Sequence, residues 1–191
     1  LRSRGLGDVY KRQAMVHNLI CGALTCVGEG TSWRYTPYHM PHRTEVMGFM
    51  TILHGDDRFY NNIFVQKWPS EDFITMHDSD DGFDSENRKV GTWMFDEYPT
   101  YDEWISQFDF TKPADMKKLE SVHFDHLPVW SEGNVYLNGA KAWKHEKSGF
   151  VSSENVKVEL TEKDGKYFLD TNIYEILEDF SGRMINTCLL Y

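Results

Sequence analysis

Residues 34–66 read R-Y-T-P-Y-H-M-P-H-R-T-E-V-M-G-F-M-T-I-L-H-G-D-D-R-F-Y-N-N-I-F-V-Q. Apolar and aromatic residues recur in this run at spacings typical of strands, and the Gly-Asp-Asp triplet is typical of a turn. We therefore predict strands at residues 46–53 and 59–65, joined by a turn at residues 55–57. A further buried strand is predicted at residues 15–23, where an apolar run ends near a glycine.

The start of the same run holds the sequence Thr-Pro-Tyr-His-Met-Pro-His at residues 36–42. Each proline pushes the residue before it toward an extended conformation, so we predict an ordered, non-helical loop that presents its side chains. Imidazoles can donate to and accept from hydroxyl groups, and aromatic faces can stack on sugars. The predicted sugar-binding residues are Arg34, Tyr38, His39, His42 and Asp57.

The histidines also have a structural interpretation, in which they satisfy backbone groups of the loop. As zinc ligands, His39 and His42 would need further partners that no motif supplies, so we expect no metal and no other cofactor. Glycoside hydrolysis needs two carboxyl groups that flank the bond, roughly 5–5.5 Å apart for retention. Asp56 and Asp57 would point to opposite faces of an extended strand, and Asp57 could instead form an ion pair with Arg58.

Short runs that begin with asparagine recur along the chain. Asn18, Asn62 and Asn134 each precede two apolar, strand-forming residues. This pattern fits coils of a parallel β-helix, in which asparagine side chains stack in a ladder at the corners. Asparagine also flanks turns in many other β proteins, so the pattern alone leaves both interpretations open.

Composition limits the classes of partner. The chain has 191 residues, is 40% hydrophobic and 15% aromatic, and carries a formal net charge of -10. An acidic chain without a basic run repels phosphate backbones, so we expect no nucleic-acid partner, and no apolar run has the length of a membrane span. The cysteines form no pairing framework, which favours a cytoplasmic location.

The remaining segments complete the predicted organisation. Thr100 is predicted to cap a short helix over residues 101–108. Residues 71–87 hold acidic side chains without Lys or Arg, and their spacing does not fit an EF-hand, so we expect a solvated loop. Residues 156–161 and 167–173 flank an Asp-Gly turn and alternate in polarity, which predicts a hairpin with one buried and one exposed face.

Both ends of the chain look unnatural. Residues 1–13 and 188–191 resemble translated sequencing-adapter sequence, so we expect a non-native leader and tail. The predicted organisation is a parallel β-helix over residues 14–140, with the acidic loop and short helix inserted, and a β-sandwich element over residues 141–187. The native part is then expected to be a fragment of a longer protein.

The runs T-P-Y-H-M-P-H (36–42), G-D-D-R-F-Y-N-N-I-F-V (55–65) and G-N-V-Y-L-N-G-A-K (133–141) resemble the C-terminal half of the β-xylosidases of glycoside hydrolase family 120. The resemblance covers most of the chain. It implies an all-β fold, with right-handed parallel β-helix coils followed by an antiparallel β-sandwich element and one or two short helices. It also implies a retaining enzyme that removes xylose from non-reducing ends, with xylo-oligosaccharides as substrate and a possible homo-oligomer.

The resemblance places the catalytic residues elsewhere. In the family, an Asp nucleophile and a Glu acid/base lie in motifs that resemble W-L-D-W and E-V-N-H-G, and neither motif occurs in this sequence. We therefore expect no catalytic residue in this chain, with residues 36–42 as a wall of the sugar pocket. The alternatives are a non-catalytic carbohydrate-binding or structural β protein, and a β-helix enzyme that acts on another sugar or on uronates.

Overall fold

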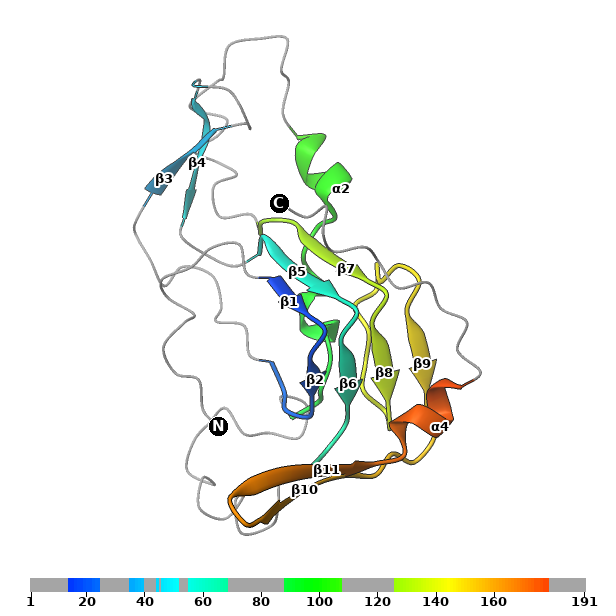
Figure 1. The fold of residues 1–191 in the computed structure, drawn as a ribbon. Coiled ribbons are helices and arrows are strands. Elements are labelled where there is room, and N and C mark those ends of the chain that lie inside the picture. The colour runs from blue at the N-terminus through cyan, green and yellow to red at the C-terminus, as the bar shows by residue number, and fades with distance from the viewer. Residues whose placement is uncertain are drawn as a thin grey trace, which may run out of the picture. The chain divides into compact units, whose positions relative to one another are not determined.

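The computed structural model describes residues 14–24, 35–39, 44, 46–51, 55–68, 88–107 and 126–178, with only the backbone of 35–39 and 46–51. Strands dominate and the helices are few and short, which confirms the all-β prediction (Figure 1). Contacts divide the chain into two compact units that alternate along the sequence. The first lies within Leu1–Ala14, Cys26–Arg58 and Phe95–Trp130, and the second within Met15–Thr25, Phe59–Met94 and Ser131–Tyr191.

A parallel four-stranded sheet is the centre of the second unit. Its strands, in spatial order, are β2 (Leu19–Ile20), β6 (Ile63–Val65), β8 (Val135–Leu137) and β9 (Phe150–Ser152). Leu19 pairs with Ile63, Ile63 with Val135, and Val135 with Phe150. Because the strands are parallel and in register, equivalent positions of successive strands lie next to one another.

A second sheet contains β1 (Ala14–Val16), β5 (Asp57–Tyr60) and β7 (Val129–Glu132). Each of these strands leads through a short corner into a strand of the four-stranded sheet: β1 into β2, β5 into β6, and β7 into β8. The corners contain His17, Asn61 and Gly133, with φ of 58°, 53° and 68°. Within the described residues, the same strand, corner and strand therefore occur three times.

The corners correct two sequence predictions. Residues 15–23 and 59–65 were each expected to form one strand, but each expected strand is interrupted by a corner and only part of residues 15–23 is extended. The reason is the left-handed backbone at His17 and Asn61, which ends one strand and redirects the chain. Asparagine tolerates this conformation better than most residues. The pattern of apolar residues, by contrast, does not predict where a left-handed corner interrupts a strand.

The corner asparagines form the ladder that their spacing suggested. The backbone N–H and Nδ2 of Asn18 both donate to Oδ1 of Asn62, at 3.0 and 3.1 Å. Asn62 repeats these two bonds on Oδ1 of Asn134, at 3.0 and 2.9 Å. The Nδ2 groups of Asn62 and Asn134 also donate to the carbonyls of Met15 and Phe59, both at 2.8 Å. The prediction of a ladder of stacked asparagines is confirmed for these three residues.

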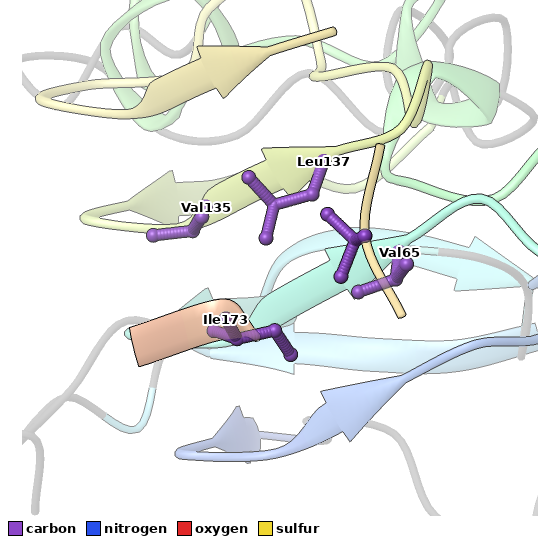
Figure 2. Close-up of a cluster of buried hydrophobic side chains, with 5 residues drawn as sticks. Val65, Val135, Leu137 and Ile173 are labelled. Atoms are coloured by element: carbon purple, nitrogen blue, oxygen red, sulfur yellow. The ribbon is translucent and has the colours of Figure 1, made fainter. Parts of the chain in front are cut away.

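Both faces of β6 and β8 are buried. On one face, Val65, Val135, Leu137, Val156 and Ile173 form an apolar cluster, and Figure 2 shows how the four labelled members converge from β6, β8 and α4 (Ile173–Leu177). On the other face, Phe64 stacks on Tyr136 with ring centroids 5.1 Å apart and planes 6° from parallel. Regular stacking of like side chains follows from the parallel register.

A separate antiparallel pair joins β3 (Tyr35–His39) to β4 (Val46–Thr51). The strand predicted at residues 46–53 is confirmed over 46–51. The loop predicted at residues 36–42 is wrong as far as His39, because that stretch pairs with β4. Tyr38 faces Gly48 and His39 faces Val46, so the register shifts by one residue between them. An extended segment that contains proline is compatible with a strand that, among the described strands, pairs with β4 alone.

The predicted hairpin is present as β10 (Val158–Lys163) and β11 (Lys166–Thr171). Asp164 and Gly165 have φ of 54° and 71°, as a two-residue turn of this composition requires. The expectation that one face of this hairpin is buried is wrong. Almost every residue of the hairpin is exposed, so no face is buried. Among the described strands, these two pair only with each other, and α4 begins where the second strand was expected to end. The β-sandwich element expected over residues 141–187 stays a prediction.

The helix predicted after Thr100 is present as α2 (Tyr101–Ile105), shorter than the predicted residues 101–108. Thr100 and Glu103 form a complete capping box, because each side chain bonds to the backbone N–H of the other. A short 3-10 helix, η1 (Trp93–Phe95), precedes it. None of the described helices is long and apolar enough to cross a membrane. The acidic stretch at residues 71–87 lies outside the described residues.

Candidate functional site

The candidate site is a partly exposed group of aromatic and charged side chains in the first unit. It consists of Asp56, Arg58, Tyr101 and Trp130, which we call the Trp130 cluster. Arg58 comes from β5 and Trp130 from β7, while Tyr101 is the first residue of α2. The cap at Thr100 fixes where this helix begins and therefore where Tyr101 stands.

Trp130 is the residue that the other side chains contact. The Arg58 guanidinium carbon lies 4.1 Å from the centroid of the Trp130 ring, which is a cation–π contact. The Tyr101 ring is stacked against Trp130 with centroids 5.9 Å apart. Tyr101 is 37% exposed, so one aromatic surface of the cluster faces solvent.

Asp56 holds the guanidinium in place. Arg58 Nη1 lies 2.8 Å from Asp56 Oδ1 and donates to the Asp56 carbonyl at 3.0 Å. The sequence suggested an ion pair between Arg58 and Asp57, and this is wrong because Arg58 pairs with Asp56. Asp56 has a left-handed backbone, with φ of 59°, instead of the extended one assumed for the Asp-Asp pair. Turn geometry therefore decides which carboxylate meets the arginine.

The turn that presents Asp56 depends on Gly55. Gly55 has φ of 108°, and a Cβ at this position would lie 2.3 Å from the Leu127 carbonyl oxygen. The Asp56 N–H donates to the Pro128 carbonyl at 2.7 Å, which ties the turn to the segment before Trp130. Glycine is required here by both backbone conformation and space.

The five predicted sugar-binding residues differ in how much of each one the structure describes. Asp57 begins β5, directly between the two charged members of the Trp130 cluster, and is partly buried. Tyr38 and His39 lie at the end of β3, whose backbone alone is described. Arg34 and His42 lie outside the described residues. Asp57 is the sequence neighbour of Asp56 and Arg58, and all five predicted sugar-binding residues stay predictions.

Sequence reasoning missed Tyr101 and Trp130. Tyr101 follows a recognisable helix cap, but nothing in the local sequence indicates that it meets a residue from a distant strand. Trp130 stands in an alternating strand, V-W-S-E, with buried, partly exposed, buried and partly exposed positions. That alternation would have predicted a half-exposed tryptophan at this position.

A second polar group, in the second unit, has a structural role. The Glu146 carboxylate accepts from the N–H of Asn134 at 3.0 Å, from its Nδ2 at 3.1 Å, and from the Tyr136 hydroxyl at 2.9 Å. It also accepts from the Ser131 hydroxyl. The bonds from Asn134 repeat the pattern of the asparagine ladder, with a carboxylate oxygen in place of an amide oxygen. Glu146 thus continues the ladder as its last acceptor.

The glycine at the next ladder position explains why a glutamate can enter. Because Val135 pairs with Phe150, Gly149 lies beside Asn134 in the register. A Cβ at Gly149 would lie 2.6 Å from Glu146 Cγ. The absent side chain leaves room for the carboxylate, which reaches the ladder from the loop before β9.

Burial raises the pKa of Glu146, and the hydrogen bonds from Ser131, Asn134 and Tyr136 act in the opposite direction. Burial and the adjacent Glu146 raise the pKa of the Tyr136 hydroxyl. A carboxyl group whose pKa is raised by folding binds its proton more tightly in the folded state. Its contribution to stability is therefore fully present below the ordinary pKa and is lost as pH rises through the raised value.

Glu146→Gln removes this titration, so the difference in stability between the unchanged protein and the variant should depend on pH. The stability of the unchanged protein minus that of the variant should fall as pH rises from 4.5, the ordinary carboxyl pKa, through the raised pKa of Glu146. The fall is about 1.4 kcal/mol for each unit of pKa difference. Urea unfolding of both proteins across that range measures the difference. Curves that stay parallel would show that folding leaves the Glu146 pKa unchanged.

Comparison with known proteins gives one informative relationship. No protein-family profile matches the chain, and no curated protein matches it. A solved structure described as the complex structure of XylC with xylose is 30% identical in sequence, with a TM-score of 0.53. The match covers 82% of this chain and 21% of the XylC chain. The chain shares its fold with part of XylC. It spans only about a fifth of that protein's length.

Proposed function

We propose that this chain is part of a glycoside hydrolase that acts as a retaining exo-β-xylosidase on xylo-oligosaccharides. Its role is to form a wall of the sugar pocket, and the catalytic Asp and Glu belong to polypeptide upstream of residue 14. The observation that carries the proposal is the match to XylC, whose structure was determined with xylose, over 82% of this chain. Fold similarity does not by itself fix a substrate, so the choice of xylose rests on that relative.

Local features support the fold part of the proposal. Three copies of a strand, corner and strand stack through a parallel sheet and an asparagine ladder. We interpret these copies as coils of a right-handed parallel β-helix. In such a fold each coil contacts mainly its neighbours, so a site can be built from residues of several coils.

The Trp130 cluster supports the binding part. Sugars present apolar C–H faces and hydroxyl groups, and binding sites for them combine aromatic rings with a few fixed polar groups. Trp130 and Tyr101 supply rings, and Arg58 supplies a guanidinium that Asp56 orients. We place Arg34, Tyr38, His39, His42 and Asp57 in the same wall.

Titration of the 191-residue chain with xylobiose, followed by NMR, tests the binding role. We expect weak, saturable binding that Trp130→Ala weakens about tenfold, since the C–H face of a sugar and the ring bury apolar surface worth about 25 cal/mol per Å². Tyr101→Ala, at a more exposed position, should weaken binding as well. Trp68→Ala is the matched control, because Trp68 is 54% exposed and belongs to the other unit.

Two results would contradict the proposal. The first is an absence of saturable binding by the folded chain. The second is an equal loss of affinity in Trp68→Ala and Trp130→Ala. Hydrolysis of an aryl β-xyloside by the pure chain would support a glycosidase but would contradict the upstream position of its carboxylates. Binding of xylobiose by a longer protein without those carboxylates would favour a carbohydrate-binding module.

A further inference from the structure

The hairpin of β10 and β11 exposes large apolar side chains. Leu160 lies opposite Leu169 in the register of the two strands, and Tyr167 shares their face. Phe168 lies on the other face, opposite Thr161. Leu160, Tyr167, Phe168 and Leu169 are between 50% and 67% exposed. A two-stranded hairpin with no covered face is only marginally stable in water, so further strands would stabilise it.

The outer edge of β11 offers backbone groups to such strands. Among the described strands, β11 pairs only with β10. A two-residue turn joins Lys163 to Lys166 as a hydrogen-bonded pair, and along an antiparallel ladder such pairs alternate with pairs that are not hydrogen-bonded. The N–H and carbonyl groups of Tyr167 and Leu169 therefore point away from β10. They form the row of donors and acceptors that an added strand can use.

The outer edge of β10 is already in contact with another segment. Lys67 Nζ donates to the carbonyl of Val158, the first residue of the strand, at 2.9 Å. Among the described residues, no side chain bonds to the backbone of β11 in this way. The edge of β11 is therefore the more accessible edge of the hairpin.

We propose that β11 pairs with β11 of a second copy of this chain, antiparallel and about a two-fold axis at Phe168. In this register Lys166 faces Asp170 of the second copy, Tyr167 faces Leu169 of the second copy, and Phe168 faces its own equivalent. Because a two-fold contact is self-complementary, each of the first two pairs occurs twice. The strand K-Y-F-L-D-T therefore matches opposite charges and apolar side chains at the same time.

Neighbouring registers do not give this match. An axis at Leu169 would place Phe168 against Asp170, and an axis at Tyr167 would place Lys166 against Phe168. Both registers lose the contact between opposite charges. The sequence of β11 therefore favours one register of self-pairing over its neighbours.

The charges favour association only at this edge. The chain carries a formal net charge of -10, so two copies repel each other at long range. Within the hairpin, Lys157 Nζ lies 2.6 Å from Asp170 Oδ2, and a carboxylate can accept from a second lysine through its other lone pairs. The inference does not depend on which sugar or reaction the protein serves.

A single cysteine on the proposed axis tests the geometry. Facing residues of a pair that is not hydrogen-bonded have Cα atoms about 4.5 Å apart, which is within the range that a disulfide spans. Under mild oxidation, Phe168→Cys should therefore give a covalent dimer, with the bond at position 168 located by peptide mass spectrometry. Thr161→Cys is the matched control, because Thr161 is exposed and shares the face of Phe168 but lies on β10. It should cross-link no more than the unchanged chain, whose own cysteines set the background.

A charge reversal tests the contact between the two copies. Lys166→Glu places like charges against Asp170 at both symmetric positions, and should raise the dissociation constant of the dimer about tenfold in sedimentation equilibrium. Lys163→Glu makes the same change of charge at an exposed position of β10. It should leave the dissociation constant within about twofold of that of the unchanged chain.

Three results would overturn the proposal. The first is an unchanged chain that stays monomeric up to its solubility limit. The second is cross-linking of Phe168→Cys that does not exceed the background, or that Thr161→Cys equals or exceeds. The third is an equal effect of Lys163→Glu and Lys166→Glu on the dissociation constant.

Discussion

Replacing Asn62 by alanine is expected to lower the free energy of unfolding by about 3–5 kcal/mol. Asn62 is fully buried, and its amide donates to Met15 and Asn134 and accepts twice from Asn18. Alanine removes all of these bonds at once. Buried groups left without a partner cost about 1–3 kcal/mol each, which is more than the net contribution of an ordinary hydrogen bond.

Urea unfolding measured by circular dichroism gives the value, with Asn155→Ala as the control. Asn155 is an exposed asparagine whose side chain takes no part in the ladder, and its loss should change stability by no more than about 0.5 kcal/mol. A loss below about 1 kcal/mol for Asn62→Ala would mean that the ladder contributes little to the fold.

Replacing Gly91 by alanine is expected to cost at least about 3 kcal/mol. Gly91 has φ of 131°, and a Cβ there would lie 2.0 Å from the Lys141 carbonyl oxygen. That carbonyl accepts from Thr92 N–H, so the clash falls on a backbone bridge that cannot move aside cheaply. The damage should spread, because the Thr92 hydroxyl bonds to Tyr136 and accepts from Trp143 N–H.

Gly139→Ala is the matched control for this prediction. Gly139 also has a positive φ, of 89°, but no heavy atom lies within 4 Å of the added Cβ. Gly139→Ala should therefore lower the free energy of unfolding only by the backbone cost of the left-handed conformation, about 1–2 kcal/mol. If thermal unfolding shows the same loss for both variants, space around Gly91 is not the cause.

The part of the fold that could be predicted from the sequence is the part with local or repeated causes. The Asp-Gly turn specifies the hairpin, and the Thr100 cap begins α2 where expected. The recurring asparagines predicted the ladder, because parallel strands in register place equivalent residues side by side. These signals are local or repeated in the sequence, so they can be recognised without knowing which distant segments pack together.

What could not be predicted depends on contacts between distant segments. The corner at Asn61 divides an apolar run that looks continuous, and the exposure of the hairpin depends on which segments pack against it. Glu146 enters the ladder from a loop, and Arg58 meets Trp130 from a strand far along the chain. No spacing rule links these pairs, so the composition of the candidate site emerged only from the structure.

The coding DNA immediately upstream of the Ala14 codon tests the central claim most directly. If the chain contributes a pocket wall to a retaining β-xylosidase, that DNA should encode further strand, corner and strand units, with an Asp and a Glu placed to flank a glycosidic bond. Reading frames that contain no such units and no such carboxylates would contradict the claim.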